Sequence, residues 1–268
     1  MGFVQNVTDL VRLNRHFYHW SKPQIVQYQQ KTILTLMQLV RQQSSFYREH
    51  YAGHSIQNLD DFGNLPTINK TVMMEQFDRL NTVGLHLDEV MAYALAKELN
   101  HDYLGYYQNR YVVGLSSGTS GNKGIYVTDR SMTQRLPGVF LARGGVSPAD
   151  LPLRILFILR VFSQGFADIN APLLKLSYLS SMTEPDEIIR TYNQMQANIL
   201  MAPPSLLRQL LPLCDKVKTP PKRVITYAEV LEKEEKTRIS KALAAPVVEI
   251  YQASEGQIGS PCRYGNLH

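Results

Sequence analysis

The sequence predicts an α/β protein built on a parallel-type sheet with crossover helices. Three observations lead to this fold class. From about residue 154 onward, short apolar runs alternate with segments of helical periodicity, which is typical of consecutive strand–helix–strand units. The first hundred residues are mainly helical in pattern, and a glycine-rich segment at 116–124 separates the two regions. With 268 residues, 44% of them hydrophobic, the chain can bury a sizeable core.

The N-terminal region predicts three helices. Apolar positions fall on one stripe from Pro23 to about Arg48, and proline in the first turn suits a helix start. The stretch Leu65–Lys70 reads as a turn that leads into a short helix, and another helix is expected over Leu87–Glu98. We therefore expect residues 1–100 to form a helical segment packed on an α/β core at 101–268.

The C-terminal region predicts alternating strands and helices. The expected strands are Arg154–Leu159, Ala197–Met201, Lys222–Tyr227 and Pro246–Tyr251, and the expected helices are Pro185–Met195, Pro204–Leu213 and Lys233–Leu243. In parallel sheets, ligands bind beyond the carboxyl ends of the strands. That rule directs attention to three strand ends, at Pro203–Ser205, Tyr227–Glu229 and Tyr251–Glu255.

The glycine-rich segment Ser116–Gly124 is the strongest indication of a binding site. Glycine loses the most backbone freedom when it is ordered, and this segment offers little apolar surface in return. Its N–H groups and hydroxyls suit an anion such as a phosphate. The Walker spacing fails because Lys123 precedes glycine rather than Ser or Thr, and a Gly-x-Gly-x-x-Gly fingerprint cannot be placed on Gly118 and Gly121.

A third motif in this segment stays open. Gly114, Ser116 and Gly118 form a literal Gly-x-Ser-x-Gly, the nucleophile elbow of α/β-hydrolases. That elbow requires a helix directly after the serine, whereas the β-branched run Ile125–Thr128 predicts a strand. A serine hydrolase that uses Ser116 is therefore an alternative to a phosphate-binding hairpin.

Bulk properties narrow the class of partner. Lys and Arg exceed Asp and Glu by 28 to 23, a net charge of +5 that suits nucleotide or CoA-like anions. The densest basic cluster, at 216–223, has no interleaved aromatic residues, so we expect no nucleic-acid partner. The sequence has no apolar run of membrane-spanning length and no signal-peptide core. Cys214 and Cys262 do not suggest a disulfide framework, so we expect a cytoplasmic protein without membrane partners.

The motifs together resemble the adenylate-forming (acyl-CoA synthetase) superfamily, and within it the branch of phenylacetate–CoA ligase and coenzyme F-390 synthetase. Ser116–Gly121 resembles its Ser-Ser-Gly-Thr-Thr-Gly phosphate loop, with Ser120 for the second threonine. Tyr227–Glu229 resembles the Gly-Ala-Glu of its adenine pocket, and Tyr251–Glu255 resembles Tyr-Gly-Leu-Ser-Glu. Weaker matches extend the resemblance from about residue 24 to the end, at Ser45–Arg48, Leu65–Lys70, Pro204–Ser205 and Cys262–His268.

The resemblance implies the large N-terminal domain of the adenylate-forming fold and a two-step reaction. A carboxylate would attack the α-phosphorus of Mg-ATP and release pyrophosphate, and the acyl-adenylate would pass to a thiol such as CoA. The implied phosphate-binding residues are Ser116, Ser117, Gly118, Thr119, Ser120, Gly121 and Lys123. The implied base-pocket residues are Ala228, Glu229 and Tyr251. Thr119, Ser254 and Glu255 would be catalytic, with Ser254 on the α-phosphate and Glu255 as the Mg²⁺ ligand.

Departures from the family pattern set further expectations. Gln252 replaces a glycine, which narrows the space beside the adenine or the acyl group. The ribose-binding aspartate, the hinge and the lysine-bearing C-terminal domain are not found before His268, so we interpret the chain as a truncated portion that would be inactive alone. A nucleotide-binding protein without turnover is a second alternative. Zinc binding by Cys262 and His268 is left open because two soft ligands fall short of four. A homodimer and an aromatic acid substrate are candidates that the sequence does not decide.

Overall fold

The computed structural model describes residues 2–116, 123–146, 150–160, 164–167, 173–253, 256–262, 264 and 266–268. The chain divides into two compact units. Unit 1 comprises Met1–Tyr18, Tyr103–Val112 and Thr128–His268, and unit 2 comprises His19–Asp102 and Val113–Val127. No helix of the described residues is both long and apolar enough to cross a membrane.

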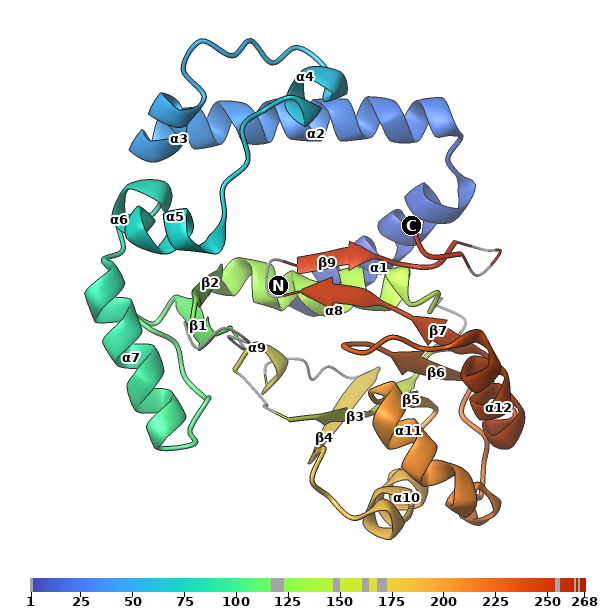
Figure 1. Ribbon diagram of the computed structural model, residues 1–268. Coiled ribbons are helices and arrows are strands. Elements are labelled where there is room, and N and C mark those ends of the chain that lie inside the picture. The colour runs from blue at the N-terminus through green and yellow to red at the C-terminus, as the bar shows by residue number, and fades with distance from the viewer. Residues whose placement is uncertain are drawn as a thin grey trace. The chain divides into compact units, whose positions relative to one another are not determined.

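Unit 1 is built on a five-stranded sheet in the order β4-β3-β5-β6-β7 (Figure 1). Its strands are β3 Leu153–Leu159, β4 Leu174–Ser180, β5 Ile199–Met201, β6 Arg223–Thr226 and β7 Val247–Glu249. Every neighbouring pair in this sheet is parallel. The predicted α/β class with a parallel sheet is therefore confirmed.

Helices cover both faces of this sheet. They are α1 Gly2–His19, α8 Arg130–Arg143, α9 Gln164–Ala167, α10 Pro185–Gln194, α11 Pro204–Leu210 with a following 3₁₀ turn Leu211–Lys216, and α12 Lys233–Leu243. Leu156 and Ile158 of β3 point to the face that packs against α10, α11 and α12. Ile155 and Phe157 point to the opposite face, which packs against α8 and α1. Because successive strand side chains alternate between faces, the apolar run of β3 serves two cores at once.

The sequence analysis did not predict α1, α9 and β9 of unit 1, nor strand β4 and helix α8. Strand β4 alternates apolar and polar residues at the edge of the sheet. Helix α8 contains Pro137 and Gly138, which both argue against a helix interior. The helix forms because hydrogen bonds to residues outside it stabilise its first turn and its middle. The carboxylate of Asp129 accepts from the Ser131 N–H at 2.8 Å, and the Gly138 N–H donates to Asn6 Oδ1 of α1 at 3.2 Å.

Unit 2 is mainly helical, with α2 Lys22–Gln43, α3 Ser45–His50, α4 Leu59–Gly63, α5 Lys70–Glu75, α6 Phe77–Leu80 and α7 Leu87–Leu99. The single helix expected from Pro23 to Arg48 is wrong because the chain is extended at Ser44. The buried Ser44 hydroxyl accepts from the Tyr47 N–H at 3.2 Å and donates to the Arg79 carbonyl at 3.0 Å. These bonds end α2 and cap α3 at one residue.

Two small sheets complete the chain. Strands β1 Tyr111–Leu115 and β2 Ile125–Asp129 form one, and β8 Tyr251–Ala253 pairs antiparallel with β9 Gly256–Gly259 in the other. The strand expected over Pro246–Tyr251 is in fact two strands, because β7 ends at Glu249 and Tyr251 begins β8. The chain therefore leaves the parallel sheet just before the segment that carries the predicted catalytic residues.

Candidate active site

The strand order of unit 1 predicts where a ligand would bind. From β3 the chain moves to β4 on one side and then returns to place β5 on the other side of β3. Loops that leave the carboxyl ends of β3 and β5 therefore diverge, and ligands of open α/β sheets bind at such a switch point. Pro203–Ser205 follows β5 at this position, and Tyr227–Glu229 follows β6 beside it.

Glu229 joins the carboxyl ends of β5 and β6. Its carboxylate accepts from the Ser205 N–H at 2.8 Å and from the Ser205 hydroxyl at 2.6 Å, at the first turn of α11. Negative charge at a helix N-terminus is favourable because the first N–H groups lack partners within the helix. Ala228 adopts φ +68°, the left-handed region, in the turn before Glu229. Both residues lie at the strand end that the sequence predicted, and both are exposed.

Two tyrosines, one on each side of β3, donate hydrogen bonds to carbonyls at its carboxyl end. The Tyr227 hydroxyl donates to the Ile158 carbonyl, and the Tyr178 hydroxyl donates to the Leu159 carbonyl at 3.0 Å. The Tyr227 ring also packs edge-on against Phe157 with 5.5 Å between the centroids. Burial raises the pKa of Tyr227 well above its usual value, so its hydroxyl stays a neutral donor. The carboxyl end of β3 is thus hydrogen-bonded from β4 and from the residue that follows β6.

A polar group at the ends of β6 and β7 escaped the sequence analysis. Thr226 and Glu249 are register partners at the last positions of their strands, so their side chains share one face of the sheet. Glu249 pairs with Lys236 of α12 at 2.7 Å, and the buried Thr226 hydroxyl has no hydrogen-bond partner among the described residues. A sequence signal existed, because a polar residue ends each of these two apolar strands.

The β8–β9 sheet carries the remaining predicted residues of unit 1. Tyr251 has 56% of its surface exposed. Gln252 pairs with Gln257 across the two strands. Ser254 and Glu255, predicted to be catalytic, lie outside the described residues.

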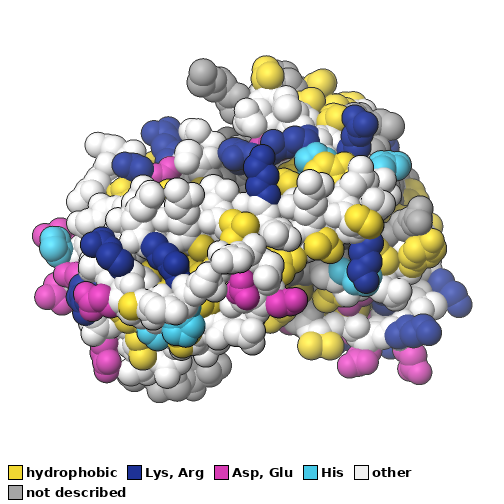
Figure 2. Space-filling model, turned by 90° about the horizontal axis from the view of Figure 1, so that it is seen from above, with side chains coloured by type: hydrophobic (Ala, Val, Ile, Leu, Met, Phe, Trp, Pro, Cys, Tyr) yellow, Lys and Arg dark blue, Asp and Glu magenta, His cyan; other side chains and the backbone are white. Residues whose placement is uncertain are grey.

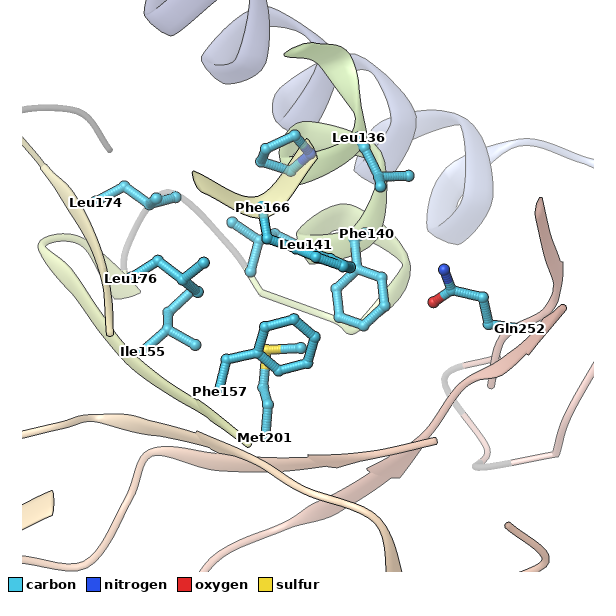
Figure 3. A pocket seen from close by; sticks show the side chains of 11 residues that line it. Leu136, Phe140, Leu141, Ile155, Phe157, Phe166, Leu174, Leu176, Met201 and Gln252 are labelled. Carbon is cyan, nitrogen blue, oxygen red and sulfur yellow. The ribbon is translucent and has the colours of Figure 1, made fainter. Parts of the chain in front are cut away.

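An apolar cavity of about 40 Å³ lies in unit 1 between the sheet and α8 (Figure 3). Its walls are Leu136, Pro137, Phe140 and Leu141 of α8, Ile155 and Phe157 of β3, Phe166 of α9, Leu174 and Leu176 of β4, and Met201 of β5. Gln252 is the polar member of the lining, and its carboxamide end turns toward the apolar cluster. The cavity therefore has an apolar interior with one hydrogen-bonding group at its side.

The glycine-rich segment belongs to unit 2, and its two ends are bonded to each other. The Ser116 N–H donates to the Gly124 carbonyl at 2.7 Å, and the Ser116 hydroxyl accepts from the Gly124 N–H at 3.0 Å. Lys123 forms an ion pair with Glu98 of α7 at 2.5 Å. Ser117, Gly118, Thr119, Ser120 and Gly121 lie outside the described residues. The chain continues from Lys123 into β2, so a nucleophile elbow on Ser116 is not favoured.

The distribution of charged and metal-ligating side chains was also compared with the sequence predictions. On the face seen in Figure 2, Lys and Arg side chains lie among acidic and uncharged ones. Within the described parts of the chain, no three His, Cys, Asp or Glu side chains come together as a metal site would require. The Cys262 N–H donates to the Asn266 carbonyl at 2.9 Å, and the His268 N–H donates to the Ser260 carbonyl at 3.0 Å.

Comparison with known proteins gives no sequence match, since neither a family model nor a curated protein matches the chain. Solved structures do match. One is 2-hydroxyisobutyryl-CoA ligase in an open conformation with 2-HIB-AMP and CoA, with a TM-score of 0.63 and 15% identity over 94% of this chain and 59% of that chain. The same ligase in its thioesterification state gives a TM-score of 0.62 and 15% identity over 94% of this chain and 54% of that chain.

A third match is that ligase in its postadenylation state with 2-HIB-AMP, with a TM-score of 0.62 and 16% identity over 94% of this chain and 54% of that chain. The chain thus spans somewhat more than half the length of the structures that it matches. At this identity the likeness concerns the fold alone. The chain therefore shares the fold of part of this ligase.

Proposed function

We propose that this chain is the ATP-binding part of an adenylate-forming ligase that activates a carboxylic acid. The observation that carries the proposal is the combination of fold and motif order. Over 94% of its length the chain shares the fold of a ligase whose structure was solved with 2-HIB-AMP and CoA. Its Tyr227–Glu229 segment lies at the carboxyl end of β6, where the topology predicts a ligand.

In this proposal the chain's own residues bind and orient rather than react covalently. Tyr251 stacks beside the adenine, and Ala228 and Glu229 line its edge. The hydroxyls and N–H groups of Ser116–Gly121 hold the β- and γ-phosphates, and Thr119 and Ser254 contact the phosphates near the reacting bond. The acid attacks the α-phosphorus and pyrophosphate leaves, so positioning and charge stabilisation supply the catalysis.

A magnesium ion fits the donor set of this proposal. Mg²⁺ usually binds through one or two carboxylates together with substrate phosphates, and Glu255 supplies such a carboxylate. Bound there, the ion would neutralise charge that develops on the phosphates. Phenylacetate–CoA ligase is the branch whose motifs the sequence resembles, and CoA is the proposed thiol acceptor.

The apolar cavity is the proposed site for the side chain of the acid. It lies beside Gln252, the residue that follows the proposed adenine-stacking Tyr251. A volume of about 40 Å³ accommodates only a few non-hydrogen atoms, since one water needs roughly 10–15 Å³ by this kind of measure. We therefore propose a short apolar acyl chain in preference to an aromatic one.

The test is ATP–pyrophosphate exchange by the full-length protein across acids of increasing size. We expect exchange with short aliphatic acids, and a loss of about 10²-fold or more for Glu255→Ala, in line with removal of a group that stabilises transition-state charge. Glu234→Ala, which removes an exposed carboxylate in the first turn of α12, serves as the matched control.

Exchange with no acid, or undiminished exchange in Glu255→Ala, would contradict the ligase. Exchange that is fastest with an arylacetic acid would contradict only the assignment of the cavity. Labelling of Ser116 by an organophosphate probe would support the hydrolase instead, and thermal stabilisation by ATP without exchange would support a binding protein without turnover.

A further inference from the structure

The antiparallel pair β8–β9 carries two glutamines that lie directly opposite each other. Gln252 of β8 and Gln257 of β9 are register partners. Opposite side chains of an antiparallel pair share one face, with their Cβ atoms about 4.5–5.5 Å apart. Both glutamines are half-buried, whereas Tyr251 and Ile258 next to them are 56% and 55% exposed. The two carboxamides therefore belong to the covered face of this small sheet.

The covered face is the one that meets the apolar cavity. Gln252 lines the cavity, and its carboxamide end turns toward the apolar side chains there (Figure 3). Gln257 shares the face of Gln252, so its side chain leaves the sheet on the side of the cavity. Both glutamines and all other lining residues belong to unit 1, so this arrangement is internal to one compact unit.

The carboxamide of Gln257 has hydrogen-bonding capacity that no described residue uses. Its Oε1 and its Nε2 are both shielded from solvent, and neither has a partner within the described part of the chain. The opposite Gln252 does not supply one. Buried polar side-chain atoms of native proteins are nearly always paired, because an unpaired one costs free energy. The two glutamines therefore offer an acceptor and a donor to a third group.

The chemistry of the two free atoms selects that group. A carboxylate only accepts hydrogen bonds, so it would leave Oε1 of Gln257 without a partner. An ammonium only donates, and it would bring an unpaired charge against an apolar lining. A hydroxyl both donates and accepts through a single heavy atom, which suits a cavity with room for only a few atoms.

We propose that Gln252 and Gln257 determine specificity and select a short aliphatic acid whose chain carries a hydroxyl group. The inference rests on the proposed function and narrows its substrate from a short acid to a short hydroxy acid. The hydroxyl donates to Oε1 of one glutamine and accepts from the Nε2 amide of the other. An acid without the hydroxyl leaves these buried groups unpaired, and a site of this kind rejects such an analogue.

The test compares ATP–pyrophosphate exchange by the full-length protein with butyrate and with 2-, 3- and 4-hydroxybutyrate, which have equal chain length. We expect kcat/KM for at least one hydroxy acid to exceed that for butyrate by about tenfold or more. Gln252→Leu and Gln257→Leu each remove one carboxamide and should lower this ratio by about fivefold or more. Gln194→Leu, which replaces an exposed glutamine at the end of α10, is the matched control and should keep the ratio.

Urea denaturation gives a second readout that does not depend on exchange. Gln257→Leu should be at least as stable as wild type, because it replaces an unpaired buried amide by an apolar group. A marked loss of stability in this variant overturns the inference, since the amide would then have a partner in the folded chain.

The exchange assay separates this inference from the proposed function. Exchange that is as fast with butyrate as with every hydroxybutyrate, or a ratio that neither leucine variant changes, overturns the role of the glutamines while the ligase stands. Exchange only with acids outside this panel has the same consequence. Exchange with no acid at all overturns the proposed function and this inference with it.

Discussion

At the scale of single residues, Glu229 belongs to a predicted nucleotide-binding motif and also forms hydrogen bonds to Ser205. Its place after β6 was predictable from the apolar run that precedes it. Its bonds to Ser205 were not, because they join segments 24 residues apart in sequence. The contact joins the first turn of α11 to the loop after β6, so Glu229 holds these two segments together.

We expect Glu229→Ala to lower the free energy of unfolding by about 1 kcal/mol, the usual cost of losing a side chain that caps a helix. Ser205→Ala keeps the backbone bond at 2.8 Å and should cost less. Urea denaturation of both variants, with Glu229→Gln as the near-isosteric control, measures these differences. Full stability in Glu229→Ala would show that the two bonds to Ser205 contribute nothing.

Other residues of the candidate site illustrate what a linear pattern misses. Thr226 and Glu249 fall within predicted strands because the residues next to them are apolar. Nothing in the linear sequence indicates that the two polar side chains lie at adjacent strand ends. Only the parallel register brings the two side chains to the same face, with Lys236 of α12 above Glu249. Lys70 was noted as part of a motif, but its place beside Gly124 depends on a contact across 54 positions of sequence.

At the scale of elements, α8 is the clearest case in which tertiary contacts override local preference. A proline and a glycine in its middle disfavour a helix, yet both are buried against other parts of unit 1. Glycine allows α1 to approach closely, because a Cβ at Gly138 would lie 2.6 Å from the Asn6 carbonyl oxygen. The buried carboxylate of Asp9 holds the same two helices, through a bond to Arg135 of α8 at 2.9 Å.

We expect Gly138→Ala to destabilise the protein by about 1–2 kcal/mol. Alanine improves helix propensity by about 0.5–1 kcal/mol, but forcing a methyl group into a packed contact costs about 1–3 kcal/mol, and the clash here is with backbone. Gly63→Ala is the control, because nothing lies within 4 Å of its Cβ position. Chemical denaturation separates the two, and a Gly138→Ala protein more stable than wild type would contradict the close approach of α1 and α8.

Element boundaries follow the same logic. The helix expected from Pro23 to Arg48 divides at Ser44 because a buried hydroxyl bonds across to Arg79. The strand expected over Pro246–Tyr251 divides after Glu249 because the Ile250 N–H still bonds to Thr226 while Tyr251 turns to pair with β9. In both places a hydrogen bond to a residue far along the chain lies at the boundary between two elements.

At the scale of the whole molecule, the proposed function predicts linkage between nucleotide and stability. A ligand that binds only the folded state raises the free energy of unfolding by about 2.7 kcal/mol at one hundred times its dissociation constant. We expect ATP to raise the urea midpoint of the full-length protein in this way, and GTP at the same concentration to raise it less, since the proposed pocket contacts the base. An ATP midpoint equal to that without nucleotide would contradict nucleotide binding.

The fold class, most strands and helices of unit 1, and the segments that end those strands were predictable without a structure. These follow from apolar periodicity and turn residues, which act over a few neighbouring positions. Three-dimensional contacts were needed to find the strand order, the presence of β4 and α8, and the surroundings of Glu229, Thr226 and Lys70. The physical reason is that register, burial and close backbone approach are properties of segments far apart in the chain, and no local pattern records them.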